Sequence, residues 1–338
     1  MLFHIDTDGV CSGVLINAFM ERLGKEMEFS LAINPNFSKQ VLEKIKNSPS
    51  DTAIFVDLSV DSSIEKIEEI ASKKKVIIMD HHMITNNLNK IRNCYHFNPL
   101  LEGNEEYYPA SIYIFNLLNK EFPNFIEDLD WIASVGLIGD GAFNIYKDFV
   151  KKTLKKYKLA FNKDPYLTKF GEFDKLVSSG RVYNGAKGAM KAFKILSSNL
   201  TIKEFEKNSD VLKNWMKKVD AEIEKQLKQF KKEKEIFKDI YFFQIHSKMN
   251  IGSPISSLLG SKYKHKTIII YENRGNIMKF HLRRTDGKQN LSKLAKEIVN
   301  GFEQSAAGGH VKAAGGHVLE KDWEIVKERM KEVLTNNN

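Results

Sequence analysis

The first half of the chain repeats one pattern, in which a short, largely apolar segment runs directly into aspartate or histidine residues. Segments 2–5, 52–56 and 76–79 have this apolar character, and helical periodicity occupies residues 10–23 and 64–71. Strands that are apolar on both faces belong to parallel sheets that are covered by helices on both sides. The pattern therefore predicts an α/β fold with a doubly wound parallel sheet.

Residues of the types that bind metal ions gather where these strands end. They are His4, Asp6, Asp8, Asp57, Asp80, His81, His82 and, farther along the chain, Asp140. Ligands of parallel sheets bind beyond the carboxyl ends of the strands, so residues that are distant in the sequence are expected to converge there. Each motif alone has a simpler explanation, since Asp6 would cap the next helix and His82 would pack as an ordinary histidine. Together they favour one shared metal site.

The mixture of carboxylate and imidazole groups indicates which ions such a site would hold. It suits Mn²⁺ or Mg²⁺, and the histidines favour Mn²⁺. No cysteine lies in the cluster, which argues against structural zinc. Two such ions about 3.5–4 Å apart would clamp a phosphoryl group and activate water, and they would need a shared carboxylate. Asp57, which follows the central apolar segment, is the expected shared ligand.

The second half of the chain predicts a smaller α/β domain behind a long helix. Residues 210–237 form an amphipathic helical pattern, which suits either a connection between two lobes or a dimer contact. Beyond it, strands are expected at 240–243, 267–271 and 277–282, and helices at 291–299 and 323–334. We therefore expect a first domain over residues 1–195, a helical linker region over 196–238 and a second domain over 239–338.

A glycine-rich segment around His310 lies in the middle of this second domain. Its glycines Gly308 and Gly309 would allow backbone N–H groups to approach a phosphate closely. Arg283 and Arg284, at the end of a preceding strand, strengthen the phosphate interpretation because guanidinium groups match phosphate oxygens. The simpler alternative is a flexible turn.

The charge balance favours a polyanionic partner. Lys and Arg exceed Asp and Glu by nine, and the pI is near 9.1; such a surplus promotes contacts with phosphate backbones. A lysine-rich surface without a ligand explains the charge equally well. The lysine clusters at 151–158 and 231–234 are expected to be solvated faces, with contact to a nucleic-acid backbone as the alternative. Two cysteines without metal-type spacing, and no segment resembling a membrane span or signal peptide, indicate a cytoplasmic protein.

Taken together, these motifs resemble those of DHH-family phosphoesterases. Segments 3–12, 56–59, 80–82 and 136–140 are similar to the family's four N-terminal motifs. Segment 307–315 resembles the GGGHxxAAG signature of the DHH-associated domain, with Ala307 in place of the first glycine. Arg283 lies where that domain usually has a substrate-binding arginine, and residues 146–240 carry no family motif.

Carried over residue by residue, the resemblance implies a site for two Mn²⁺ ions, or Mg²⁺ in their place. One ion would bind His4, Asp6 and Asp57, and the other would bind Asp8, Asp57, His81 and Asp140. Asp57, Asp80 and His82 would form the catalytic group, with His82 beside the phosphate that is cleaved. The residues that would bind substrate from the second domain are Arg283, Arg284, Gly308, Gly309 and His310.

The first motif, in which Val10 and Ser12 follow Gly9, resembles that of RecJ-like exonucleases more than that of nanoRNases. The resemblance thus implies an exonuclease that hydrolyses single-stranded DNA or RNA by two-metal activation of water. No oligonucleotide-binding barrel follows the glycine-rich domain, so the alternative is a phosphoesterase for nanoRNA, cyclic dinucleotides or 3′-phosphoadenosine 5′-phosphate. A non-catalytic, replisome-associated DHH protein is the third hypothesis, and the complete ligand set argues against it.

Overall fold

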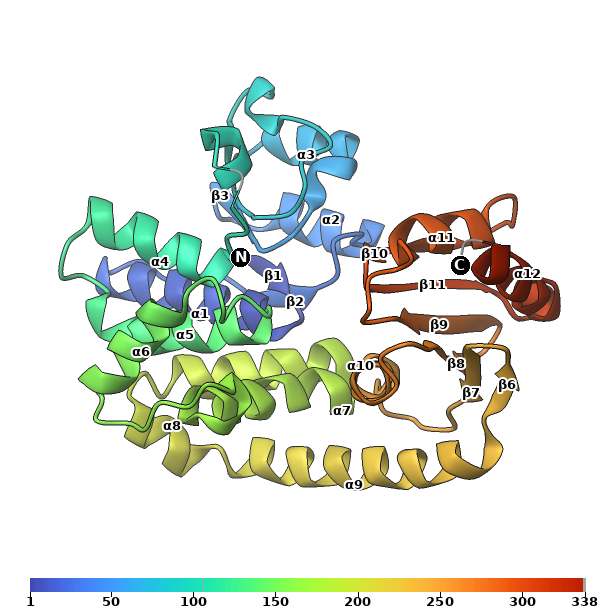
Figure 1. Ribbon diagram of the computed structural model, residues 1–338. Coiled ribbons are helices and arrows are strands. Elements are labelled where there is room, and N and C mark those ends of the chain that lie inside the picture. The colour runs from blue at the N-terminus through green and yellow to red at the C-terminus, as the bar shows by residue number, and fades with distance from the viewer. Residues whose placement is uncertain (105, 337–338) are drawn as a thin grey trace. The chain divides into compact units, whose positions relative to one another are not determined.

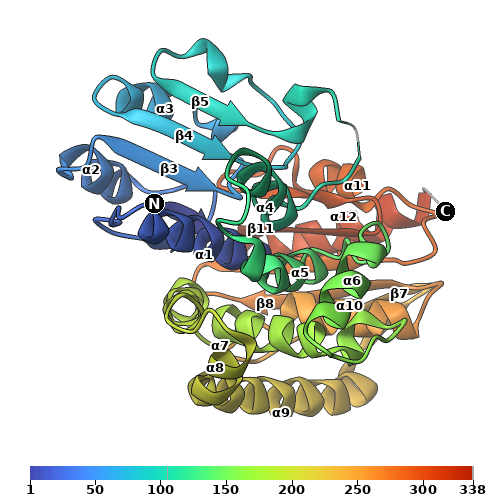
Figure 2. The ribbon, with the colours of Figure 1, turned by 90° about the vertical axis from the view of Figure 1, so that its left-hand side faces the viewer.

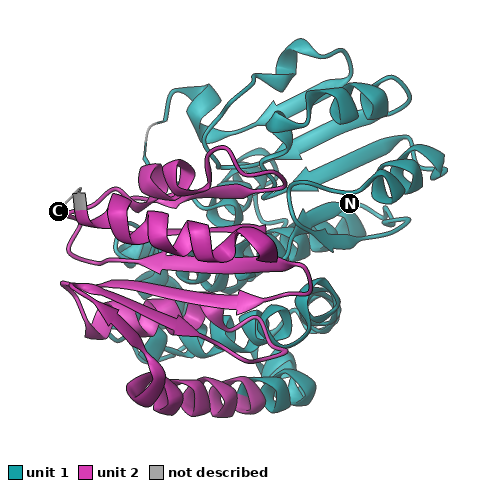
Figure 3. Cartoon of the chain, turned by 90° about the vertical axis from the view of Figure 1, so that its right-hand side faces the viewer, with its two compact units in different colours: residues 1–216 teal, residues 217–338 magenta. Residues whose placement is uncertain are grey.

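The computed structural model describes residues 1–104 and 106–336 of the chain. The chain divides into two compact units, residues 1–216 and 217–338, which Figure 3 distinguishes by colour. Each unit has its own sheet and its own hydrophobic core. Within the described residues, no helix is both long enough and apolar enough to span a membrane.

A five-stranded parallel sheet in the order β2-β1-β3-β4-β5 forms the centre of the first unit (Figure 1). The strands are β1 (Leu2–His4), β2 (Leu31–Ile33), β3 (Thr52–Val56), β4 (Lys75–Met79) and β5 (Cys94–Phe97). The chain passes from β1 to β2 on one side and then to β3 on the other side of β1, so the strand order reverses between β1 and β3. In open α/β sheets, ligands bind at such a reversal.

Helices cover both faces of this sheet (Figure 2). The helices of the unit are α1 (Thr7–Arg22), α2 (Lys39–Asn47), α3 (Ile64–Ala71), α4 (Ala110–Glu121), α5 (Asp130–Gly139), α6 (Lys147–Lys156), α7 (Lys169–Ser197) and α8 (Ile202–Asn208). Phe3 and Val56 pack into the core formed with α1, α4, α5 and α7, whereas Leu2 and Phe55 pack with α2 and α3. Successive strand residues thus face opposite layers, as in a doubly wound α/β fold.

The second unit contains a mixed six-stranded sheet in the order β10-β11-β9-β8-β7-β6. Its strands are β6 (Glu235–Phe237), β7 (Ile240–Gln244), β8 (Thr267–Asn273), β9 (Ile277–Arg283), β10 (Ala306–His310) and β11 (Ala313–Leu319). Its helices are α10 (Gly252–Lys262), α11 (Leu291–Val299) and α12 (Trp323–Asn336), and the long helix α9 (Asp210–Glu233) crosses the division between the units. Phe242 and Phe280 on the sheet pack against Ile298 of α11 and Val326 of α12.

Most predicted strands and helices are present, but the end of one helix and the conformation of the glycine-rich segment differ from the expectation. The amphipathic helix ends at Glu233 rather than at residue 237, because Glu235–Phe237 pairs with β7 as β6. The glycine-rich segment is a β-hairpin, since β10 pairs with β11 in antiparallel register from Ala306 to His310. Glycines have low strand propensity, so the local sequence does not reveal this pairing.

Candidate metal centre

The register of the first sheet brings the predicted ligands to one edge. Phe3 lies opposite Val56, Val56 opposite Met79, and Met79 opposite Phe97. The residues that follow these four positions therefore leave the sheet side by side. They include the segments that carry the first three motifs, and they lie at the strand-order reversal between β1 and β3.

The end of β1 and the start of α1 supply a first ligand group, which consists of His4, Asp6 and Asp57. Asp6 caps α1 by accepting a hydrogen bond of 3.0 Å from the Gly9 N–H, so its capping interpretation is correct. Its other oxygen lies 2.8 Å from His4 Nδ1. A Cβ atom at position 9 would collide with the carbonyl group of His4, so only glycine allows α1 to start this close to β1.

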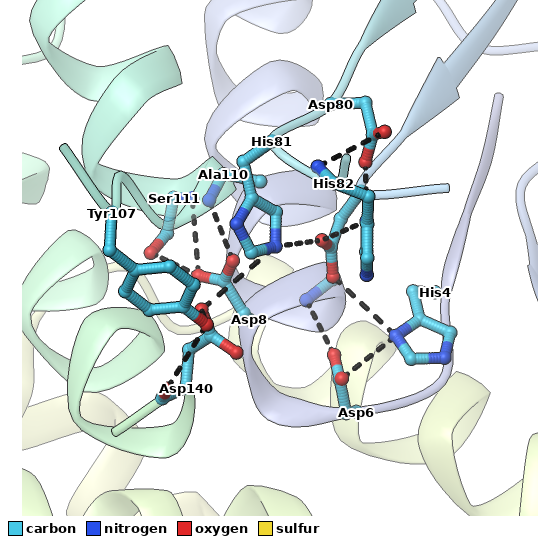
Figure 4. Close-up of polar contacts among 12 residues, drawn as sticks. His4, Asp6, Asp8, Asp80, His81, His82, Tyr107, Ala110, Ser111 and Asp140 are labelled. Carbon is cyan, nitrogen blue, oxygen red and sulfur yellow. Dashed lines mark hydrogen bonds and ion pairs between the residues drawn. The ribbon is translucent and has the colours of Figure 1, made fainter. Parts of the chain in front are cut away.

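A second ligand group consists of Asp8, His81 and Asp140, whose ligand atoms lie within 4.8 Å of one another (Figure 4). Asp8 is 1% exposed, and its carboxylate accepts hydrogen bonds from the N–H groups of Ala110 (2.7 Å) and Ser111 (3.1 Å) at the start of α4. Asp140 follows the last residue of α5, and its Oδ2 lies 3.9 Å from His81 Nε2. Sequence-distant segments thus meet here, as predicted from the strand ends.

Asp57 links the two groups, because each of its oxygens faces a different one. Oδ2 lies 3.6 Å from His4 Nδ1, and Oδ1 lies 3.1 Å from His81 Nε2. Among the described residues, none donates a well-oriented hydrogen bond to either oxygen, although the carboxylate is buried. The backbone of Asp57 has φ +55°, a left-handed conformation that non-glycine residues adopt at some cost and that is concentrated at functional sites.

His82 lies beside these groups and is oriented by Asp80. Its Nδ1 is 2.7 Å from Asp80 Oδ1, and its backbone carbonyl accepts a hydrogen bond of 3.0 Å from the Asn98 side chain. The same Nδ1 lies 4.0 Å from Asp57 Oδ1. The His82 side chain remains 38% exposed, so Asp80 holds an accessible imidazole next to the ligand groups.

Burial and concentrated negative charge control protonation in this cluster. Burial and the charges of Asp57 and Asp140 raise the pKa of Asp8 well above its ordinary value, and burial is also the main cause that raises the pKa of Asp140 to about 6. Burial opposes the charged form of His81, but the contact with Asp57 and the charges of Asp57, Asp8 and Asp140 together outweigh it and raise the pKa of this histidine to about 10. Without a cation, the cluster therefore retains protons.

These observations fit divalent cations. The groups offer carboxylate oxygens and imidazole nitrogens, which suit Mn²⁺ and Mg²⁺, and neither buried cysteine, Cys11 or Cys94, belongs to them. The buried oxygens of Asp57 lack the donors that such atoms normally have. A bound cation would balance their charge and displace protons from the histidines. The fold thus brings all six predicted metal ligands together, with Asp57 between the two groups.

Several contacts that support the cluster were not predicted. Tyr107 donates a hydrogen bond of 2.5 Å to Asp140 Oδ2, and its ring lies 5.6 Å from that of His81 in an edge-on arrangement. The Ser111 hydroxyl donates to Asp8 in addition to its backbone N–H. Both residues reach the cluster at or just before the start of α4, far from the strand ends in sequence, so no local motif indicates their position.

The second unit contains a separate pocket of about 170 Å³ near the turn of the β10–β11 hairpin. It is lined by Ser253, Ser256, His281, Leu282, Arg283, Gly308, Gly309, Ala313, Ala314 and Gly315. The Arg283 guanidinium donates a 2.5 Å hydrogen bond to Ser257 on α10, and burial lowers the pKa of this arginine. No described residue accepts a hydrogen bond from its Nε. The pocket therefore presents a cationic group whose hydrogen-bonding capacity is only partly used.

Not all the predicted substrate-binding residues line this pocket. Arg284 is 4% exposed, and its guanidinium forms ion pairs with Asp239 (2.6 Å) and Asp286 (3.0 Å), which give it a structural role within the second unit. His310 is the last residue of β10, where it pairs with Ala313 next to the hairpin turn, and it is exposed. The pocket thus includes Arg283, Gly308 and Gly309 but neither Arg284 nor His310.

Comparison with known proteins agrees with this architecture. Residues 1–137 match the DHH family, N-terminal domain, whereas no curated protein matches the sequence. Exonuclease RecJ bound to manganese has a TM-score of 0.68 and 14% identity, over 98% of this chain and 88% of RecJ. RecJ in complex with Mg²⁺ from Thermus thermophilus has a TM-score of 0.62 and 15% identity, over 99% of this chain and 49% of that RecJ.

A third solved structure is similar along its whole length. The pGpG-specific phosphodiesterase PggH from Vibrio cholerae has a TM-score of 0.55 and 14% identity, over 100% of this chain and 99% of PggH. At such identities, the structural likenesses establish a shared fold. The DHH match covers the segments that carry β1 to β5 and most of the ligands. Residues 1–137 therefore match the N-terminal domain of the DHH family, and the chain shares its fold with RecJ.

Proposed function

We propose that this chain is a metal-dependent phosphodiesterase that holds two divalent cations, for which Mn²⁺ is the best fit, and acts as a RecJ-like exonuclease on single-stranded DNA or RNA. The observation that carries the proposal is the position of Asp57, with one oxygen facing His4 and the other facing His81. A carboxylate placed in this way between two ligand groups suits a pair of ions. Paired ions of this kind are typical of phosphodiester hydrolysis.

In the proposed assignment, His4, Asp6 and Asp57 hold one cation, and Asp8, Asp57, His81 and Asp140 hold the other. When bound, such ions lower the pKa of water and neutralise charge on the phosphate. Asp80 orients the imidazole of His82, which we place beside the phosphate as a donor of a proton or a hydrogen bond.

The pocket of the second unit supplies the proposed substrate contacts. The guanidinium of Arg283 matches phosphate oxygens, and the open space above Gly308 leaves its backbone accessible. His310 stays a proposed substrate contact because its exposed side chain is free to meet a ligand from outside the pocket. Arg284 is assigned no substrate contact, since its ion pairs hold it in the interior of the unit.

A length-resolved and sugar-resolved cleavage assay tests the proposal. Single-stranded DNA and RNA oligomers of increasing length, labelled at either end, are incubated with the protein and Mn²⁺, with Mg²⁺, or with EDTA. We expect stepwise shortening of long strands that depends on the cation and is lost in the Asp57→Asn variant. Absence of cation-dependent cleavage on every substrate would refute the phosphodiesterase assignment.

A second candidate is a phosphodiesterase for short substrates. It is favoured by the likeness to the pGpG-specific enzyme, which spans 99% of that protein, and by the small volume of the second-unit pocket, about 170 Å³. The same assay separates the two. Cleavage confined to dinucleotides and oligomers of a few residues would exclude the exonuclease and support the short-substrate enzyme.

A further inference from the structure

Helix α6 and the segment that follows it carry an unusual concentration of positive charge. Residues 147–164 contain seven lysines and two aspartates. On α6, the buried side consists of Val150, Thr153 and Leu154, and it packs against α5. The lysines therefore occupy the outward side of a helix that lies on the surface of the first unit (Figure 2).

Three of these lysines form a continuous stripe. Lys147, Lys151 and Lys155 follow one another at i, i+4 and i+8, so they lie on the same side of α6, one helical turn apart. All three are exposed. We call this set the α6 lysine stripe. Like charges at this spacing repel one another and destabilise the helix, so the arrangement has a cost that a bound polyanion would remove.

The stripe differs from other lysines of the chain in its partners. Within residues 1–104 and 106–336, no carboxylate lies within ion-pairing distance of Lys147, Lys151 or Lys155. On α9, by contrast, Lys225 and Lys228 pair with glutamates one turn away. Lysine side chains with local carboxylate partners belong to an ordinary solvated face, whereas the stripe has charges left for an external partner.

An aromatic ring lies next to the stripe. The Nζ atoms of Lys147 and Lys151 lie 5.9 and 5.8 Å from the centre of the Phe161 ring. Phe161 in turn stacks on Phe143 of the core at 6.3 Å. Two stripe lysines are thus held over one ring, which limits their range of positions. Lys156 is excluded from the stripe because it pairs with Asp130 at 3.0 Å.

We propose that the α6 lysine stripe is a second contact site for single-stranded nucleic acid, which binds the phosphate backbone of the strand away from the cleaved bond. The inference rests on the proposed phosphodiesterase function and extends it, because only a long substrate reaches beyond the metal centre. The contact is electrostatic and independent of base sequence, since lysines bind phosphates as point charges. It distinguishes long substrates from dinucleotides.

Binding is measured with a fluorescent 20-nucleotide single strand in EDTA, so that the result does not depend on cleavage. The variant Lys147→Gln/Lys151→Gln/Lys155→Gln removes the stripe and keeps good helix propensity. The control Lys217→Gln/Lys225→Gln/Lys228→Gln removes the same charge from exposed positions of α9. For single strands, the slope of log affinity against log salt concentration is about −0.7 per phosphate contact. The loss of three contacts should therefore make this slope less negative by about 2. At about 0.1 M salt, the affinity for the single strand should fall on the order of 10- to 100-fold.

The proposal predicts that only the stripe variant loses affinity, and that its cleavage of a dinucleotide with Mn²⁺ stays at the level of the unmodified protein. Equal losses in both variants, or no loss in the stripe variant, would overturn it. Vesicles of phosphatidylserine serve as a second probe. If the stripe substitutions weaken vesicle binding but leave strand binding unchanged, the partner is a membrane surface and the inference is wrong. Absence of all cleavage, with the binding result intact, would refute the proposed function alone.

Discussion

Replacing Asp57 with asparagine tests the proposed two-cation site most directly. The substitution removes one negative charge and keeps the size of the side chain. It also suits the backbone, because asparagine tolerates the left-handed conformation that Asp57 adopts at φ +55°. The negative charge of Asp57 is one cause of the raised pKa values of Asp8 and Asp140. The same charge also raises the pKa of His81, so the substitution removes attraction as well as repulsion, and the stability of the metal-free variant should change little.

The expected loss of function follows from the position of the two carboxylate oxygens. They lie 3.6 Å from His4 Nδ1 and 3.1 Å from His81 Nε2, so one substitution removes a ligand from each ion. Loss of an outer partner of a metal ligand typically costs 10- to 100-fold in affinity. Loss of a direct ligand at both ions should cost at least roughly 100-fold overall. We expect turnover to fall by about 1,000-fold or more, which corresponds to about 4 kcal/mol of transition-state stabilisation.

Three measurements check this prediction on the purified full chain. Calorimetric titration with Mn²⁺ gives the number of ions and their affinity, the oligonucleotide assay gives turnover, and thermal unfolding in EDTA reports the fold. Asp51→Asn is the matched control, since Asp51 is exposed and directly precedes β3, at the opposite end of the same strand from Asp57. If Asp57→Asn still binds two ions or keeps substantial Mn²⁺-supported turnover, the assignment of Asp57 as the shared ligand is refuted.

Three further expectations concern the surroundings of the cluster. Tyr107→Phe removes the hydrogen bond to Asp140 and should reduce Mn²⁺ affinity by about 10-fold, with unchanged unfolding in EDTA; titration calorimetry would show an unchanged affinity if the bond has no positioning role. Mn²⁺ binding should release protons near pH 7, because the pKa of His81 is raised to about 10 without a cation and that of His4 is also raised; calorimetry in buffers of different ionisation enthalpy would give zero release if neither histidine is a ligand. Burial raises the pKa of Asp174 to about 6 despite the hydrogen bond from Thr7. Because this folded pKa lies above the unfolded one, its contribution to the unfolding free energy is complete below about pH 4 and is lost as the pH rises through about 6. Asp174→Asn should remove this dependence, worth about 2 to 3 kcal/mol, and parallel denaturant curves of both proteins from about pH 4 to 7 would contradict it.

The convergence of the proposed metal ligands was predictable because it depends on a regular feature of the fold. Apolar segments such as Thr52–Val56 identify parallel strands, and parallel strands end at one edge of the sheet. A ligand-type residue that directly follows such a segment, as Asp57 and Asp80 do, is therefore placed by the strand itself. Asp140 was predicted as a ligand from its place in the same series of residues and from its motif, and it reaches the cluster from the end of α5 rather than from a strand.

The residues that support the cluster could not be predicted in the same way. Tyr107 and Ser111 contact Asp140 and Asp8 from positions that depend on how α4 packs against α1 and α5. Such packing is fixed by many long-range contacts, and no short motif encodes it. Arg284 was predicted to bind substrate, but it forms a buried ion pair with Asp239 instead. Asp239 lies in the connection between β6 and β7, far from Arg284 in the sequence, so the sequence around Arg284 does not reveal this partner.

The electrostatic state of the cluster connects its stability with its proposed chemistry. Asp8 and Asp57 are nearly inaccessible to solvent, and the charges of Asp57 and Asp140 raise the pKa of Asp8. Buried carboxylates in such proximity oppose folding unless protons or cations balance them. The hydrogen bonds from the start of α4 to Asp8 offset part of this cost, but Asp57 has no comparable donor among the described residues. The fold thus keeps this carboxylate without a well-oriented hydrogen-bond donor and in a strained backbone conformation, with only the His4 and His81 side chains beside its negative charge. The need to balance this buried negative charge is the physical reason to expect cations on both sides of Asp57.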